Sequence, residues 1–185
     1  MPRTTPLAIA IAVVATLVAC HGCKNDGPSG QNPSASSSAA PQAKPYTALG
    51  LSFSYPAAYS VELSTSNPEA HQIAVSSTTL PGVLTIRLNS VDPTAPIDID
   101  KVAETTRATM DPSATVNPTS MKVGTQSYDA RAIKSASLGL VPVTDVVAVV
   151  PMSGRNYLIM LHAANEDVAK AASMFGTVLG SLKPQ

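Results

Sequence analysis

Two cysteines stand close together near the N-terminus, and they are the only two in the 185-residue chain. Cys20 ends a short apolar run, and Cys23 follows after His21 and Gly22. Such thiols can be joined to a lipid, form a disulfide or bind a metal ion. Because a structural zinc site takes four ligands, His21 and Cys23 alone make a poor metal site. We therefore expect no metal here and interpret Cys23 as an incidental thiol, with an intermolecular disulfide as the alternative.

The segment before Cys20 is typical of an exported protein. Arg3 precedes residues 7–19, which are apolar except for Thr16. This run has the length of a signal-peptide core, but it is too short to cross a bilayer, which takes about 20 apolar residues. The sequence therefore predicts that residues 1–19 are a signal peptide.

The residues at the cleavage site resemble the processing pattern of bacterial lipoproteins. Ordinary signal peptidase requires small side chains one and three positions before the cut, and Leu17 is too large for the farther position. Leu17-Val18-Ala19-Cys20 instead matches the lipoprotein pattern, which predicts a lipid on Cys20; a secreted soluble protein is the alternative. His21 stands where an aspartate would retain a lipoprotein in the inner membrane of enteric bacteria. We therefore expect a lipid-anchored protein of the bacterial cell envelope, at the outer membrane where the organism has one and otherwise at the plasma membrane.

The next segment has the composition of a flexible linker. Residues 25–45 contain no Val, Ile, Leu, Met, Phe, Tyr or Trp, and they are rich in Ser, Pro and Ala. Such a segment cannot bury enough apolar surface to offset the entropy lost on ordering it. We therefore expect residues 20–45 to form a disordered tether that begins with the lipidated cysteine. Residues 46–185 are long enough to form one domain with a single core.

Residues with catalytic or metal-binding potential are better explained by folding. No G-x-S-x-G motif is present for serine chemistry, and His162 lies in a strongly apolar run, as a packed or edge histidine does. Asp98 and Asp100 depart from the EF-hand pattern after two ligands and are well placed to cap a helix. The formal net charge is +0 and no basic run is present, which argues against nucleic acid. We expect no enzymatic activity, no cofactor and no nucleic-acid partner.

Four side chains in the predicted domain are of types that favour binding interfaces. Tyr128, Arg131, Arg155 and Tyr157 lie in or beside predicted strands and could line a shallow binding surface. The alternative is that they merely cover the sheet. They are the candidate site of the domain, and Cys20 is the candidate site of lipid attachment.

Patterns of apolar residues predict the strands that would position these side chains. Strands with one buried face are expected at residues 51–55, 84–89 and 128–132, with shorter strands at 61–63 and 73–75. Two further runs, 143–150 and 157–163, are apolar on nearly both faces, which is typical of central strands covered on both sides. Ser153 and Gly154 between these runs predict a hairpin turn.

Two segments have helical periodicity. Asp98 or Asp100 would cap the first, which is expected to end at about Met110. Asn165 would cap the second, which carries an apolar stripe at 3.6-residue spacing over residues 168–182. Strands, one helix, more strands and a terminal helix predict an α+β domain. We expect an antiparallel sheet of about six to eight strands with helices packed on both faces.

Small residues recur at every fourth position of the second predicted helix, at Ala172, Gly176 and Gly180. Within a membrane this spacing would favour pairing of helices. The helix is short, however, and carries Lys170 and acidic residues near its start. We therefore interpret the small residues as a surface for close packing of the helix on the sheet.

Both ends of the predicted domain resemble those of PsbP-like domains. Residues 50–61 run an aromatic strand into Pro56 and place Tyr59 shortly afterwards, and residues 175–182 resemble the family's terminal helix, with its aliphatic-x-Ser-aliphatic ending. The resemblance covers roughly residues 48–183. It implies an antiparallel sheet between helices and no shared enzymatic activity. The family includes photosystem II extrinsic proteins, a Ran-binding import factor and bacterial lipoproteins of the DcrB and LpqN type, and its members tend to bind or steady other proteins.

Two functions follow from these expectations. The first is a noncatalytic, membrane-tethered envelope lipoprotein that binds or supports a protein partner, because a lipid anchor raises the local concentration and lets modest affinity suffice. The second is a carrier of a small ligand or lipid in a pocket between sheet and helix. A closed apolar cavity would favour the carrier, and an exposed patch of several hundred Å² would favour the protein partner.

Overall fold

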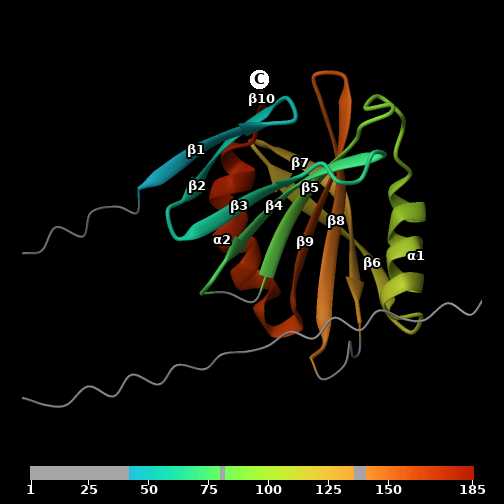
Figure 1. Ribbon diagram of the computed structural model, residues 1–185. Coiled ribbons are helices and arrows are strands. Elements are labelled where there is room, and N and C mark those ends of the chain that lie inside the picture. The colour runs from blue at the N-terminus through green and yellow to red at the C-terminus, as the bar shows by residue number, and fades with distance from the viewer. Residues whose placement is uncertain (1–41, 80–81, 136–140) are drawn as a thin grey trace, which may run out of the picture. The chain divides into compact units, whose positions relative to one another are not determined.

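Strands make up more than half of the described chain. The computed structural model describes residues 42–79, 82–135 and 141–185, and Figure 1 shows two helices on opposite sides of a large β-sheet. Cys20, Cys23, the predicted signal peptide and most of the predicted tether lie outside the described residues. The fold is therefore α+β, as the sequence predicts.

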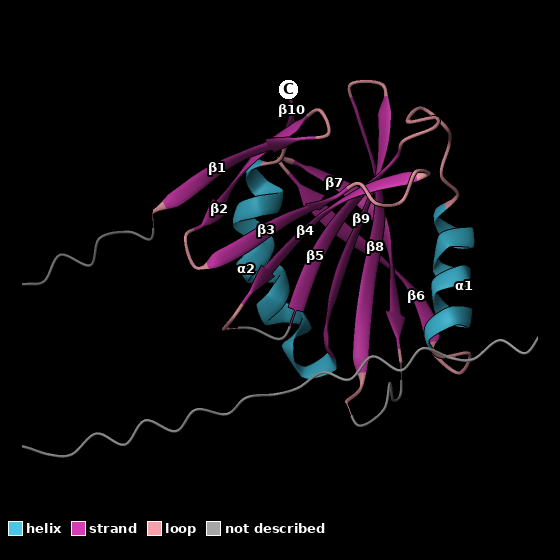
Figure 2. Ribbon diagram, viewed as in Figure 1, coloured by secondary structure: helices cyan, strands magenta, loops and turns pink. Residues whose placement is uncertain are grey.

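The large sheet has seven strands, all paired in antiparallel fashion, in the order β3-β4-β5-β9-β8-β7-β6 (Figure 2). Their bounds are β3 Tyr59–Ser64, β4 Ala70–Ser77, β5 Gly82–Asn89, β6 Thr115–Val123, β7 Gln126–Lys134, β8 Val143–Met152 and β9 Arg155–Ala164. Strands β8 and β9 are central, as predicted, and a turn at Ser153 and Gly154 joins them. Both turn residues have positive φ, 47° and 73°, as a two-residue turn of type I′ requires.

Strand β6 is an edge strand that the sequence analysis did not predict. Polar residues and Pro118 interrupt its pattern, and of its nine residues only Met121 and Val123 are buried. Because an edge strand has one neighbour and is widely exposed, it does not need the alternation of a half-buried strand. The signal that remained in the sequence was Gly124, which opens the two-residue turn into β7 with a φ of 58°.

A second, three-stranded sheet has the order β1-β2-β10, with β1 at Ala43–Ala48, β2 at Leu51–Pro56 and β10 at Lys183–Pro184. The predicted strand at 51–55 is β2, but it belongs to this small sheet and not to the large one. Strand β1 pairs along the whole of β2, from Ala43 opposite Pro56 to Ala48 opposite Leu51. The first strand therefore begins three residues before the predicted domain boundary, inside the segment assigned to the tether.

Helix α1, Ile99–Met110, begins where the sequence predicts. Asp98 is its N-cap, and Oδ1 of Asp98 accepts hydrogen bonds from the backbone N–H groups of Asp100 and Lys101 at 3.0 and 3.1 Å. These bonds satisfy donors that have no partner within the helix. Asp111 ends the helix in an extended conformation.

Helix α2, Val168–Ser181, follows a short 3-10 turn, η1, at Asn165–Asp167. The prediction that Asn165 caps this helix is wrong. Its side chain accepts a hydrogen bond from the Thr144 hydroxyl at 2.6 Å and donates to the Ser135 carbonyl at 3.4 Å. Asn165 is therefore used to join β8, η1 and the end of β7, and no side chain caps α2.

The two faces of the large sheet bury different clusters. On β9, Tyr157, Ile159 and Leu161 face the main core, which contains Phe175 and its neighbours on α2. The alternate residues Leu158 and Met160 pack against a smaller cluster around Ala103 of α1. Since side chains alternate between the faces of a strand, α1 and α2 cover opposite faces, which confirms the predicted arrangement.

Candidate binding groove

The candidate surface proposed from the sequence does not come together as one surface. Tyr157 is buried in the main core, with 1% of its surface exposed, and its hydroxyl donates to the Leu49 carbonyl at 2.8 Å. Nη1 of the exposed Arg155 donates to the same carbonyl at 3.2 Å. These two side chains therefore hold the β1–β2 turn at Leu49 and Gly50 in place.

The other two residues lie on opposite faces of β7. The ring of Tyr128 packs against the main core on the α2 face, and its hydroxyl donates to Oε1 of Gln126 at 2.6 Å. Arg131 has the other orientation, because its Nε donates to Oδ1 of Asp100, in α1, at 2.6 Å. This ion pair raises the pKa of Arg131. The described structure thus uses all four side chains for packing or for contacts within the domain.

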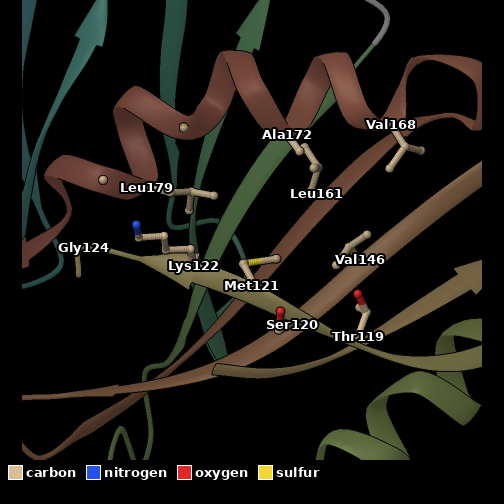
Figure 3. Close-up of a pocket in the computed structure, with 12 residues that line it drawn as sticks. Thr119, Ser120, Met121, Lys122, Gly124, Val146, Leu161, Val168, Ala172 and Leu179 are labelled. Atoms are coloured by element: carbon tan, nitrogen blue, oxygen red, sulfur yellow. The ribbon is translucent and has the colours of Figure 1, made fainter. Parts of the chain in front are cut away.

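A groove between α2 and the edge strand β6 is the site that the fold itself creates (Figure 3). It has a volume of about 550 Å³. In Figure 3, Val168, Ala172 and Leu179 of α2 stand across the groove from Met121 and Lys122 of β6, with Val146 and Leu161 between them. The lining residues are Thr119, Ser120, Met121, Lys122, Gly124, Val146, Leu161, Val168, Ala172, Gly176, Leu179 and Gly180.

Small residues of α2 keep this groove open. The helix packs on the core through Ala171, Phe175 and Val178, all buried. Ala172, Gly176 and Gly180 lie on a neighbouring side of the helix and are exposed. Apart from the adjacent backbone of the helix itself, a Cβ added at either glycine would have no atom within 4 Å. The interpretation of these residues as a close-packing surface is therefore wrong, because they face open space along the groove.

One end of the groove is closed by a backbone hydrogen bond. The N–H of Gly124, in the β6–β7 turn, donates to the carbonyl of Leu179 at 2.8 Å. The lining itself contains no His, Cys, Asp or Glu, and Lys122 is its single ionisable residue. Among the described residues, no hydrogen bond or ion pair engages the Lys122 ammonium group. The groove thus offers apolar surface, two hydroxyls and one cation, and it lacks a general acid or base.

A second cleft, of about 410 Å³, lies on the other face between α1 and strands β5 and β9. Its floor includes Leu158 and Met160, and Arg87 and Lys101 border it together with Asp98. Cations and a carboxylate therefore share its rim. The cleft differs from the α2–β6 groove in having a carboxylate, Asp98, in its lining.

His162 forms a partly buried polar contact away from both clefts. Its Nδ1 lies 2.8 Å from Oδ1 of Asp145, which is 1% exposed, and the two residues are opposite each other on β9 and β8. The hydrogen bond to Asp145 raises the pKa of His162, although partial burial opposes this effect. Asp145 therefore gives His162 a structural role as a cross-strand partner, and of the two interpretations, a packed or an edge histidine, the central position of β9 favours the first.

Within the described ranges, no group of three or more His, Cys, Asp or Glu side chains is placed to hold a metal ion. The acidic residues near α1 have other roles: Asp98 caps the helix, and Asp92 accepts hydrogen bonds from the N–H and hydroxyl of Thr94. The bonds from Thr94 lower the pKa of Asp92. In the same described residues, neither helix has the length and apolar character needed to span a bilayer.

Comparison with known proteins defines the class of fold. No protein-family model and no curated protein matches the sequence. The solution structure of cyanobacterial PsbP (CyanoP) from Synechocystis sp. PCC 6803 is similar with a TM-score of 0.50 at 14% identity, over 80% of this chain and 96% of that chain. This likeness shows that the domain has a PsbP-like fold, which confirms the resemblance found in the sequence.

Two further solved structures are more distant. A crystal structure from Bacteroides thetaiotaomicron VPI-5482 has a TM-score of 0.43 at 14% identity, over 74% of this chain and 45% of that chain. LpqN, which is involved in cell envelope biogenesis of Mycobacterium tuberculosis, has a TM-score of 0.36 at 12% identity, over 77% of this chain and 90% of that chain.

Proposed function

We propose that this protein is a noncatalytic, lipid-tethered protein of the bacterial cell envelope that holds a protein partner in the α2–β6 groove. The observation that carries the proposal is the open side of α2, where Gly176 and Gly180 leave a groove of about 550 Å³ beside an edge strand. A folded domain normally covers an apolar helix face, so a face that stays open beside a strand edge favours an external partner.

The chemistry of the groove supports binding without catalysis. Its lining contains a single ionisable side chain, Lys122, and no residue that could exchange a proton near neutral pH. The tether predicted before residue 43 would keep this groove near the membrane. Because a lipid-anchored protein meets membrane partners at high effective concentration, a short groove with modest intrinsic affinity suffices.

Site-specific crosslinking in cells tests the proposal. A photoreactive p-benzoylphenylalanine at position 176 would project into the groove, where a side chain meets no atom within 4 Å. The matched control is the same group at position 177, because Thr177 is exposed on α2 but does not line the groove. We expect a membrane-associated protein to be captured from position 176 and not from 177, and less of it when Cys20→Ser removes the lipid.

The absence of any protein captured specifically from position 176 would contradict the proposal. Equal capture with Cys20→Ser would instead support the groove as a partner site and show that the lipid tether is not needed for binding. The whole chain is expressed, so the variants with Cys20 keep the predicted signals for export and lipid attachment.

A carrier of a small apolar ligand is the second candidate function, and the same groove favours it. Its volume lies within the range of about 300–1,000 Å³ that is usual for small-molecule sites, and its lining includes the apolar side chains of Val146, Leu161, Val168 and Leu179. Native mass spectrometry of the purified chain tests this function. A co-purifying small molecule that is displaced by Ala172→Glu, which places a charge in the groove, would support the carrier and would replace the protein partner as the occupant.

A further inference from the structure

The outer edge of β6 faces the groove. The residues whose backbone N–H and C=O groups point outward from this edge can be assigned. Strands β6 and β7 are joined by the two-residue turn Gly124-Thr125, so the flanking pair, Val123 and Gln126, is a hydrogen-bonded pair. Alternate residues of an antiparallel strand direct their N–H and C=O groups to opposite sides. Odd-numbered residues of β6 therefore bond to β7, and even-numbered residues direct their backbone groups away from it.

Pro118 confirms this assignment and divides the edge into two halves. Proline has no N–H and is tolerated in a sheet where its nitrogen faces outward from an edge strand. Pro118 is even-numbered, so the first half of β6 lacks an outward N–H donor and is less able to pair with another strand. Ser120 and Lys122 then present the outward N–H and C=O groups of the second half. No described residue outside the β6–β7 ladder accepts a backbone hydrogen bond from either one.

Gly124, the next residue with an outward N–H, shows that the outward backbone groups of Ser120 and Lys122 lie on the side of α2. The N–H of Gly124 points the same way and reaches the Leu179 carbonyl of α2 at 2.8 Å. Ser120, Lys122 and Gly124 all line the groove, together with Gly176 and Gly180 of α2. The second half of the β6 edge and the small-residue side of α2 therefore form the two walls of one slot. Neighbouring strands lie about 4.8 Å apart, and the missing side chains of the two glycines leave space for such a neighbour.

We propose that the partner inserts an extended segment into this slot as an additional antiparallel or parallel strand on β6. This inference rests on the proposed function and specifies how the partner is held. The backbone of the segment would bond to the free N–H and C=O groups of Ser120 and Lys122. Its side chains on the α2 side would be apolar and would lie beside Met121, and an acidic group would lie near the Lys122 ammonium.

The described residues favour a peptide over the other occupants. A lipid would fill the apolar part of the groove, but it has no ladder of donors and acceptors for the strand edge. The tether of this chain has no apolar side chain larger than those of Ala and Pro over residues 25–45, so it matches the Met121 side chain poorly. The lone cation of the lining also matches a partner with a carboxylate better than a second copy that brings another Lys122.

Two substitutions at one position test this mode of binding in the full-length chain. Ser120→Pro removes the outward N–H beside an existing tolerated proline, whereas Ser120→Ala keeps the N–H and removes only an exposed hydroxyl. Each is combined with the crosslinker at position 176. We expect Ser120→Pro to lower the yield of the partner adduct about tenfold, because it deletes a backbone hydrogen bond and its ring blocks close approach of a strand. Ser120→Ala should leave the yield unchanged.

Mass spectrometry of the adduct identifies the occupant, and hydrogen exchange supplies an independent measurement. A peptide synthesised from the crosslinked segment should slow amide exchange at Ser120 and Lys122 at least about tenfold in the chain with Cys20→Ser. Circular dichroism of both Ser120 variants establishes that they are folded.

Each other result overturns the inference in a distinguishable way. If the protein adduct still forms with Ser120→Pro and the amides of Ser120 and Lys122 are not protected, strand addition is wrong. The proposed function would still hold in that case. An adduct with a second copy or with a lipid identifies that occupant in place of a partner segment. No specific adduct at position 176 removes the proposed function and this inference together.

Discussion

The backbone N–H of Gly124 donates to the carbonyl oxygen of Leu179 at 2.8 Å, across the end of a groove that is otherwise open. This bond joins the β6–β7 turn directly to the last part of α2. Because this bond fixes α2 and β6, the two walls of the groove, relative to each other, the groove is preformed. A partner would therefore not have to order either wall on binding.

Replacing Gly176 with alanine should raise the free energy of unfolding by about 1 kcal/mol. Alanine is the better helix former, and the new methyl group would meet no atom within 4 Å. Urea denaturation followed by circular dichroism measures the change in the chain with Cys20→Ser. Gly82→Ala is the control and should be destabilising, because its Cβ would lie 3.2 Å from the His162 carbonyl oxygen. A loss of stability in Gly176→Ala would show that this side of α2 is closely packed.

Tyr157→Phe should lower the free energy of unfolding by about 1 kcal/mol. The change removes the partly buried hydrogen bond to Leu49 and leaves that carbonyl with Arg155 alone. Tyr128→Phe is the matched control, since its hydroxyl bonds to the exposed Gln126 and its loss should cost less than about 0.5 kcal/mol. Equal effects of the two changes in urea denaturation would contradict the role assigned to Tyr157 at the β1–β2 turn.

The imidazole of His162 should titrate above its ordinary pKa of 6.5, because it is hydrogen-bonded to Asp145. Asp145→Asn removes the negative charge and should lower the pKa of His162. Two-dimensional NMR of the imidazole C–H resonances across pH 5–9 measures both values. An unchanged pKa in Asp145→Asn would show that the contact with Asp145 does not control the titration.

The same pair makes stability depend on pH. Because the pKa of His162 is raised in the folded state, its stabilising contribution is complete below the unfolded value of about 6.5 and is lost as the pH rises through the folded pKa. The difference in unfolding free energy between the natural chain and Asp145→Asn should therefore be largest near pH 5.5 and smaller at pH 9. Urea denaturation at several pH values tests this trend, and a difference that grows with pH would oppose it.

Asp98→Ala should destabilise the domain by about 1 kcal/mol, because two N–H groups at the start of α1 lose their acceptor. Asp129→Ala, on an exposed position of β7, should change the stability by only a few tenths of a kcal/mol. Thermal unfolding of both variants gives the comparison. If the two variants unfold alike, Asp98 does not act as a cap.

The elements with strong patterns could be predicted from the sequence alone. Strands β8 and β9 are apolar on both faces and lie at the centre, and the start of α1 at Asp98 follows from one capping residue. Strand β6 could not be predicted, because its edge position imposes no alternation and Pro118 argues against a strand. Asn165 is of a residue type that often caps helices. Its side chain instead bonds to Thr144 and Ser135, which are distant in the sequence, so the sequence pattern alone could not show it.

The candidate site was harder to predict than the fold. Residue type alone suggested an interface at Tyr128, Arg131, Arg155 and Tyr157, but the strand register separates Tyr128 from Arg131 onto opposite faces and buries Tyr157. The small-residue stripe of α2 was visible in the sequence. Whether such a stripe faces a sheet or open space depends on which neighbouring residues, here Phe175 and Val178, take the core positions.

The position of β1 has a mechanical consequence. Any tension transmitted through the residues before Ala43 is applied at the open end of the β1–β2 hairpin, where Ala43 faces Pro56. Force at that point would separate the hairpin's hydrogen bonds one after another, whereas a load along both strands would strain them all at once. None of the residues that line the α2–β6 groove belongs to β1. The hairpin would therefore separate first under a pull on the segment before Ala43, while the α2–β6 groove keeps its shape.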